Sequence, residues 1–198
     1  MPKTEALSDA RNRAEVRERI LNTACTLFYQ SGVRAVGVDL VVDKAGVAKT
    51  SLYRHFGTKD DLIAAFLERE DADFWRTWEG VSAQNSGDAA AELDAHLEWI
   101  GERVGRPNYR GCPQINVAAE FPDIDHPARK VAVAHKRQMR RRLKLIAERL
   151  GVTRPDELAG QLSLLINGAF VSSQIFEPGE ATPLLRRAAH ALIEAGRT

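Results

Sequence analysis

The chain has 198 residues, a formal net charge of +1 and 44% hydrophobic residues, which is ordinary for a globular protein of one or two domains. No apolar run approaches the roughly 18 residues of a membrane span, and the polar first residues lack the apolar core of a secretory signal. The two cysteines lie far apart and give no disulfide framework. The sequence therefore predicts a cytoplasmic protein without a membrane anchor.

Positive charge is concentrated at the start of the chain. Residues 1–60 contain ten Lys or Arg and seven Asp or Glu, a net of +3, which leaves −2 for the rest of a chain whose total is +1. A basic head on a slightly acidic body is typical of a protein in which only the head approaches phosphate.

The first helix is expected to begin after a short polar segment. Residues 1–12 show no hydrophobic periodicity and are predicted to lack regular structure. Arg11 and Arg13 could contact phosphate, although solvated charges are the simpler interpretation. Between residues 13 and 31 apolar residues recur on one helix face, and Gly32 then ends the helix.

Two short helices separated by a glycine turn are predicted in residues 38–59. Gly46 gives the backbone freedom for a sharp reversal, and Leu52 and Phe56, four residues apart, face inward from the second helix. This arrangement describes a helix-turn-helix, whose second helix enters the major groove of DNA. The opposite face of that helix carries hydrogen-bond donors and no acidic residue: Lys49, Thr50, Ser51, Tyr53, Arg54 and His55.

This segment also resembles a known family. AGVAKTSLYRHFGTKDDL is similar to the DNA-binding signature of the TetR-type repressors, and the similarity extends back to Ile20 through ILNTACTLFYQSGVRAV. The resemblance implies a homodimer that binds a palindromic operator in double-stranded DNA, with half-sites about one helical turn apart. The residues that it and the side-chain chemistry assign to DNA contacts are Lys49, Thr50, Ser51, Tyr53, Arg54, His55 and Lys59.

Three residues depart from the family pattern. Gly37 and Ala48 stand where Ser or Thr often caps the two contact helices, and loss of such a cap typically costs about 1 kcal/mol. Leu40 stands where a polar, outward residue is usual, which leaves the first contact helix poor in base-reading groups. An alternative is therefore a helical ligand-binding or scaffolding module whose head has lost its affinity for DNA.

A long helix is expected at residues 58–81. Thr58 and Asp61 form a capping-box pattern, and Lys59 at the helix N-terminus is placed to contact phosphate. The prediction is an all-α fold of about nine helices, with a DNA-binding domain and its N-terminal arm at residues 1–57 and an effector-binding and dimerisation domain at residues 58–198. After a linker at 82–88, helix signals recur at about residues 88–104, 112–121, 125–150, from 155 and from 182.

The second predicted domain contains residues suited to a small-molecule pocket. Apolar walls with a few polar groups are what such a site requires. Aromatic residues at helical spacing are more often plain core, so each candidate also has a structural interpretation. The candidates for contact with an effector, whose identity the sequence does not reveal, are Trp75, Trp78, His96, Trp99, Arg103, Asn116, Phe121 and Phe170.

The last two helices are the predicted dimer surface. Both carry broad apolar stripes interrupted by small residues, and a pair from each subunit would form a four-helix bundle. The same stripes could instead pack only within one chain. The residues predicted at the interface are Leu162, Ile166, Phe170, Leu185, Ala189 and Leu192.

Two further features have alternative interpretations. Residues 129–149 hold nine Lys or Arg and one acid, which fits the solvated face of an amphipathic helix, a second nucleic-acid surface or an anion site. Cys112, at a predicted helix N-terminus, is either a small cap or a redox or electrophile sensor. An enzyme would use Cys112 as nucleophile with His96 or His135 as base, but no orienting third residue is evident.

The favoured interpretation is a transcriptional regulator and not an enzyme. We expect a homodimeric repressor that a small-molecule effector releases from its operator. The five histidines and two cysteines are scattered, so no metal site is predicted, and no glycine-rich phosphate loop indicates a cofactor.

Overall fold

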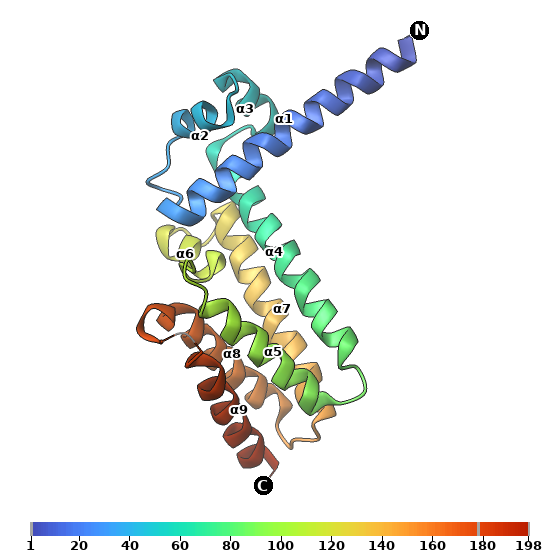
Figure 1. Cartoon of the computed structure of the whole chain (residues 1–198), viewed down its shortest axis with the longest axis vertical. Coiled ribbons are helices and arrows are strands. Elements are labelled where there is room, and N and C mark those ends of the chain that lie inside the picture. Colours follow the sequence, from blue (N-terminus) through green and yellow to red (C-terminus); the bar gives the residue numbers. More distant parts are fainter. Residues whose placement is uncertain (1, 178, 198) are drawn as a thin grey trace. The chain divides into compact units, whose positions relative to one another are not determined.

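The computed structural model of the chain describes residues 2–177 and 179–197, with side chains from Ala10 onward. In these ranges every regular element is helical, which confirms the all-α prediction, and the elements carry the labels of Figure 1. They are α1 (Pro2–Ser31), α2 (Val38–Ala45), α3 (Lys49–Phe56), α4 (Lys59–Gln84), α5 (Ala89–Val104), α6 (Pro113–Glu120), α7 (Pro127–Arg149), α8 (Pro155–Ser172), the 3-10 turn η1 (Ser173–Ile175) and α9 (Ala181–Arg197).

The start of α1 corrects one prediction. Residues 1–12 were expected to lack regular structure, but from Pro2 onward they continue α1, while Met1 lies outside the described residues. Proline suits the first turn of a helix, where its missing N–H needs no partner, and Ala, Glu and Leu in this segment favour helix. Because no apolar stripe marks the segment, the periodicity could not reveal it.

Packing divides the chain into two compact units that differ from the predicted domains. Unit 1 comprises Met1–Glu70 and Pro113–Ala132, and unit 2 comprises Asp71–Cys112 and Val133–Thr198. Helices α4 and α7 each contribute residues to both units. The predicted boundary between residues 57 and 58 separates the two expected functions, DNA binding and effector binding with dimerisation. It stays a prediction.

Unit 1 has a core built from α1 to α4 and closed by residues of α6 and α7. Leu52 and Phe56 of α3 are buried with Phe28 of α1 and Phe66 of α4, whose rings meet edge to face at 5.8 Å. Side chains from the later segment, Val117 and others, belong to the same cluster. The helix-turn-helix therefore rests on a core that the first 70 residues do not complete alone.

Glu120 at the end of α6 joins that helix to the loop after α1. Its carboxylate accepts hydrogen bonds from the backbone N–H groups of Val33 at 3.2 Å and Arg34 at 2.9 Å. Arg34 Nη1 donates in return to the Glu120 carbonyl oxygen at 3.3 Å. Gly32, with φ of 87°, turns the chain into this loop. The loop that leads to the contact helices is thus fixed by a residue far along the chain.

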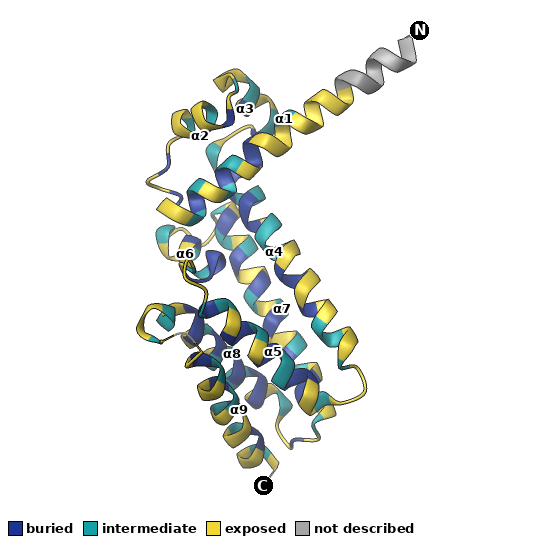
Figure 2. Cartoon of the chain, in the orientation of Figure 1, coloured by how far each residue is buried: buried dark blue, intermediate teal, exposed yellow. Residues whose placement is uncertain are grey.

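Unit 2 is a helical bundle in which α9 packs against α5 and α8, which lie side by side in Figure 1. Asp88 caps α5 by accepting hydrogen bonds from the N–H groups of Ala90 and Ala91. Gly101 of α5 lies so near α9 that an added Cβ would be 2.8 Å from Thr182 Cα, which allows the two helices a close approach. The buried face of each helix is dark blue in Figure 2.

In the described part of the chain, no helix combines the length and the apolar character that crossing a membrane demands.

Candidate functional site

The turn between α2 and α3 has the geometry that the sequence predicts. Gly46 adopts a left-handed conformation, φ 63° and ψ 43°, and its N–H donates to the Asp43 carbonyl at 3.1 Å. The N–H of Val47 donates to the Val42 carbonyl at 3.1 Å, which completes a Schellman-type end of α2. A side chain at residue 46 would strain this conformation, so glycine is required at the reversal.

Helix α3 has one buried and one exposed face. Leu52 is fully buried and Phe56 is 4% exposed, whereas Tyr53 is 43% exposed. The exposed face presents ammonium, guanidinium and hydroxyl donors at the surface, as a helix that meets phosphate or base edges needs to do. Among the predicted contact residues, Lys49, Thr50, Tyr53 and Arg54 are exposed, and Ser51, His55 and Lys59 are half-buried.

An ion pair joins the two contact helices. Lys49 Nζ at the start of α3 lies 2.7 Å from Asp39 Oδ1 in the first turn of α2. The hydrogen bond to Asp39 and the carboxylate charge raise the pKa of Lys49 above its ordinary value. Sequence reasoning missed this pair, because nothing in the spacing of residues 39 and 49 shows that the turn brings them together.

The N-termini of the three helices near this surface differ in their caps. Gly37 and Ala48 make no side-chain cap to α2 or α3, as the sequence indicates. At the start of α4, the N–H of Asp61 donates to Thr58 Oγ1 at 3.0 Å and the N–H of Thr58 donates to Asp61 Oδ2 at 3.0 Å. The predicted capping box is therefore present, and Lys59 occupies the first turn of α4 beside it.

The predicted effector residues do not all belong to one packing unit. Asn116 and Phe121 belong to unit 1, where Asn116 is exposed and the Phe121 ring stacks on His126 at 3.7 Å. The other six candidates belong to unit 2.

Unit 2 contains a cluster of aromatic rings from α4, α5 and α7. Trp78 stacks on the buried His96 with ring centroids 3.8 Å apart, and the Phe74 ring lies 4.9 Å from Trp99. Burial lowers the pKa of His96 to about 4, so its ring is neutral near pH 7. Phe74 and His135, which also belong to the cluster, were absent from the predicted effector residues.

Cys112 contacts a lysine and not a histidine. Lys136 Nζ lies 3.4 Å from Cys112 Sγ and donates to Asn167 Oδ1 at 2.9 Å, and it lies over the Phe170 ring at 5.1 Å. Burial lowers the pKa of Lys136. The Cys–His arrangement that an enzyme would need is not formed, because His96 pairs with Ser82 and His135 with Asp71 among the described contacts.

Many of the basic residues of α7 have defined partners. Arg142 Nη2 lies 2.9 Å from Glu79 Oε1 and its guanidinium stacks over Trp75, and Lys144 Nζ lies 2.7 Å from Asp156 Oδ2. Arg149 pairs with the buried Glu92. These contacts join α7 to α4, α5 and α8, so part of the run of positive charge has partners within unit 2.

The structure places most of the residues predicted at the dimer surface inside the single chain, and the interface itself stays a prediction. Leu162, Ile166, Phe170, Leu185 and Ala189 are all buried within the single chain, and only Leu192 is half-buried. The five buried residues lie in the interior of unit 2, so their side chains are covered in the single chain, whereas Leu192 remains partly accessible. The exposed apolar residues of α8, η1 and α9 are Leu164, Val171, Ile175 and Leu184.

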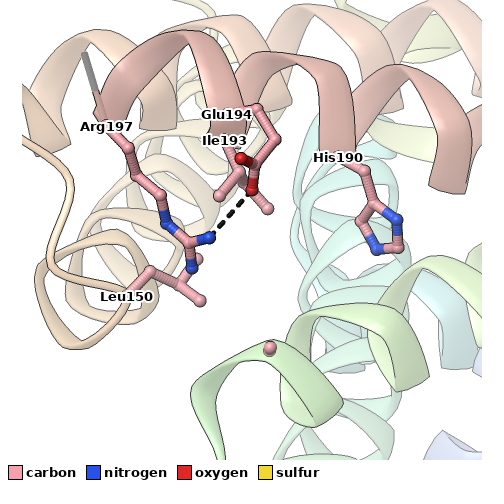
Figure 3. Close-up of a pocket in the computed structure, with 6 residues that line it drawn as sticks. Leu150, His190, Ile193, Glu194 and Arg197 are labelled. Carbon is pink, nitrogen blue, oxygen red and sulfur yellow. Dashed lines mark hydrogen bonds and ion pairs between the residues drawn. The ribbon is translucent and has the colours of Figure 1, made fainter.

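A surface pocket of about 330 Å³ lies in unit 2 between α9 and residues of α5 and the end of α7. Two of its lining residues, Arg197 and Glu194, form an ion pair with nitrogen and oxygen 2.8 Å apart. Figure 3 marks this pair with a dashed line. None of the predicted effector residues lines this pocket. Its lining residues are Ala90, Leu150, His190, Ile193, Glu194 and Arg197.

Comparison with known proteins agrees with the helix-turn-helix geometry. Residues 20–66 match the family model described as bacterial regulatory proteins, tetR family. A curated relative, the HTH-type transcriptional repressor Rv3405c of Mycobacterium tuberculosis, is 29% identical over 192 residues, with 89% of this chain and 97% of the relative covered.

Solved structures match nearly the whole chain. SCO4454, a TetR-family transcriptional regulator from Streptomyces coelicolor, superposes with a TM-score of 0.88 at 28% identity, covering 93% of this chain and 97% of that one. A crystal structure assigned as a TetR transcriptional regulator from Streptomyces avermitilis has a TM-score of 0.79 at 32% identity, covering 91% and 97%.

Proposed function

Because the chain belongs to the TetR family of bacterial transcriptional regulators, we propose that it is a homodimeric repressor that leaves a palindromic operator when a small molecule binds. The observation that carries the DNA-binding part is the two-faced α3. Leu52 and Phe56 anchor the helix, while its exposed donors can approach phosphate and base edges. Lys49 can do so when it leaves its ion pair with Asp39.

The proposed dimer uses the exposed apolar surface of α8 and α9. Leu164 and Val171 are seven residues apart, on one face of α8, and are 75% and 67% exposed. Gly168 lies between them and leaves open space above the helix, which lets another helix approach. Burial of such side chains against a second copy would remove apolar surface from water, and a four-helix bundle is the arrangement that fits.

The proposed release requires that a ligand in unit 2 changes the spacing of the two DNA-binding heads. Helix α4 supports this idea, because it begins beside the helix-turn-helix and continues into the aromatic cluster with Trp75 and Trp78. A ligand shifts the equilibrium only if it binds the dimer conformation released from DNA more tightly than the conformation that fits the operator.

The experiment begins with selection of bound fragments from a random duplex pool. The selected duplex is then tested by gel shift against the double variant Lys49→Ala/Tyr53→Phe. We expect weaker retention with the dimer intact by ultracentrifugation, whereas Arg141→Ala, which removes an exposed charge from unit 2, binds as the unmodified protein does. Unchanged retention by the double variant would count against the proposed surface.

A further inference from the structure

Asp71 and His135 form a buried pair in unit 2. His135 is 3% exposed, and its Nδ1 lies 2.6 Å from Asp71 Oδ1. The same oxygen accepts a hydrogen bond from Trp75 Nε1 at 2.7 Å. An ionised carboxylate only accepts hydrogen bonds, so Nδ1 carries the proton of this contact. The pair therefore fixes which nitrogen of the imidazole is protonated.

The other ring nitrogen of His135 is buried without a hydrogen-bond partner among the described residues. Burial lowers the pKa of His135 to about 4, so the ring is neutral near pH 7 and Nε2 holds a lone pair. A buried polar atom without a partner is costly and requires an explanation. Nε2 is thus a hydrogen-bond acceptor held in place by Asp71.

Aromatic rings pack against His135, and the positive charges of Lys136 and Arg103 also act on it. The Phe74 ring lies 4.8 Å from the imidazole at a steep angle, and the Trp75 ring lies 5.1 Å away. Trp99 extends the aromatic surface beyond Phe74. A buried water usually needs two to four polar partners, and ring faces supply none. An apolar molecule that carries one hydrogen-bond donor would donate to His135 Nε2 and pack against the aromatic rings.

We infer that His135 Nε2 is the hydrogen-bond acceptor of the effector site, and that the effector is a neutral, largely apolar or aromatic molecule with a hydroxyl or N–H donor. This inference rests on the proposed ligand-binding role of unit 2 and gives that site its ligand class. Asp71 is a positioning residue, because it acts on the ligand only through the imidazole.

His96 is the natural comparison within the same cluster. It is also fully buried, and its Nδ1 lacks a partner among the described residues. Its Nε2, however, lies 3.1 Å from the Ser82 hydroxyl and 3.7 Å from a Glu92 oxygen. A hydroxyl can donate or accept, so the tautomer of His96 is less strongly fixed than that of His135. The acceptor is therefore assigned to His135.

The test compares three small probes on the full-length protein by calorimetry. Phenol donates a hydrogen bond, anisole has the same ring but only accepts, and benzoate carries a negative charge. We expect phenol to bind about three- to tenfold more tightly than anisole, the ratio that one net hydrogen bond supplies. Equal binding of phenol and anisole, absence of phenol binding, or preference for benzoate would overturn the inference.

Variants test whether His135 causes the preference for phenol over anisole. His135→Phe keeps a ring but removes the acceptor, so phenol and anisole should bind alike. Arg141→Ala, at an exposed residue of unit 2, should keep the preference. Asp71→Ala should reduce the preference for phenol, because the imidazole proton would no longer be held on Nδ1. A preference that survives in a folded His135→Phe protein contradicts the assignment.

Nitrogen NMR of the unmodified protein decides the question without a variant. Phenol should shift the Nε2 resonance of His135 and leave Nδ1 nearly unchanged, and anisole should shift neither. A Nε2 resonance that already reports a hydrogen bond before phenol is added would assign the atom to bound water. Binding of the selected duplex, measured without probes, separates the proposed regulator function from this inference. If the protein binds the duplex but shows no preference for phenol, only the inference about His135 is overturned.

Discussion

Lys49 Nζ lies 2.7 Å from Asp39 Oδ1, and this ion pair joins the first turn of α2 to the first turn of α3 on the surface proposed to meet DNA. Both side chains are largely exposed, so the pair contributes little to stability. Its proposed importance lies in function, because we expect Asp39 to compete with DNA phosphate for the ammonium group of Lys49.

Removal of the Asp39 charge is expected to strengthen DNA binding. Asp39→Asn leaves a side chain of similar size, frees Lys49 and takes a negative charge away from the phosphates. We expect a gain of a few fold in affinity for the selected duplex, measured by fluorescence anisotropy at several salt concentrations. Lys49→Ala should instead lower the salt slope by about 1. Weaker binding by Asp39→Asn would mean that the pair orients Lys49 and does not compete with DNA.

Glu120 is expected to stabilise the loop before the contact helices. Glu120→Ala removes the acceptor for the N–H groups of Val33 and Arg34, and hydrogen bonds to a charged group contribute about 1.5–3 kcal/mol. Hydrogen exchange of residues 32–37 should accelerate in this variant. Glu98→Gln, at an exposed residue of α5, is the control and should leave exchange in the loop unchanged.

The tryptophan signal separates the two units in that experiment. All three tryptophans, Trp75, Trp78 and Trp99, belong to unit 2, whereas Glu120 belongs to unit 1. Tryptophan fluorescence should therefore change little in Glu120→Ala. Loop exchange that stays slow would show that the rest of unit 1 holds the loop without this residue.

Acid should destabilise unit 2. Burial lowers the pKa of His96 and His135 to about 4 in the folded protein, whereas an unfolded histidine has a pKa near 6.5. The unfolded chain therefore binds more protons between these values, and stability that is complete above pH 6.5 falls as pH is lowered. Each histidine is expected to cost about 2 kcal/mol near pH 5.

Urea unfolding followed by tryptophan fluorescence measures this loss. His96→Gln should flatten the dependence of the unfolding free energy on pH, while His190→Gln, at an exposed histidine, should leave its slope as it is. A free energy that is the same near pH 7 and pH 5 would contradict the neutral, buried state of both rings.

A charge on the exposed face of α8 should block the proposed dimer. Leu164→Glu is expected to fold normally, because the side chain is 75% exposed, and to be monomeric in analytical ultracentrifugation. Ile124→Glu introduces the same charge at another exposed apolar residue, in unit 1, and should leave the association state unchanged. A Leu164→Glu protein that still dimerises would move the interface to another face.

The sequence by itself determined the helices and the helix-turn-helix, because their signals are local. Gly46 at the reversal, Leu52 and Phe56 four residues apart, and the reciprocal caps of Thr58 and Asp61 act over one or two helical turns. Such short-range geometry follows from helical periodicity and backbone sterics, so the buried residues of α3 and most of its exposed ones could be predicted, although Ser51 and His55 are half-buried.

Tertiary structure alone decided the relationships between distant residues. Glu120 bonds to residues 86 and 87 positions earlier, and Asp71 fixes the tautomer of a histidine 64 positions later, which no periodicity encodes. The same holds for the apolar stripe of α8: Leu162 and Ile166 are buried, whereas Leu164 remains exposed. A broad stripe shows that a helix packs, but the positions of its neighbours decide which residues they cover.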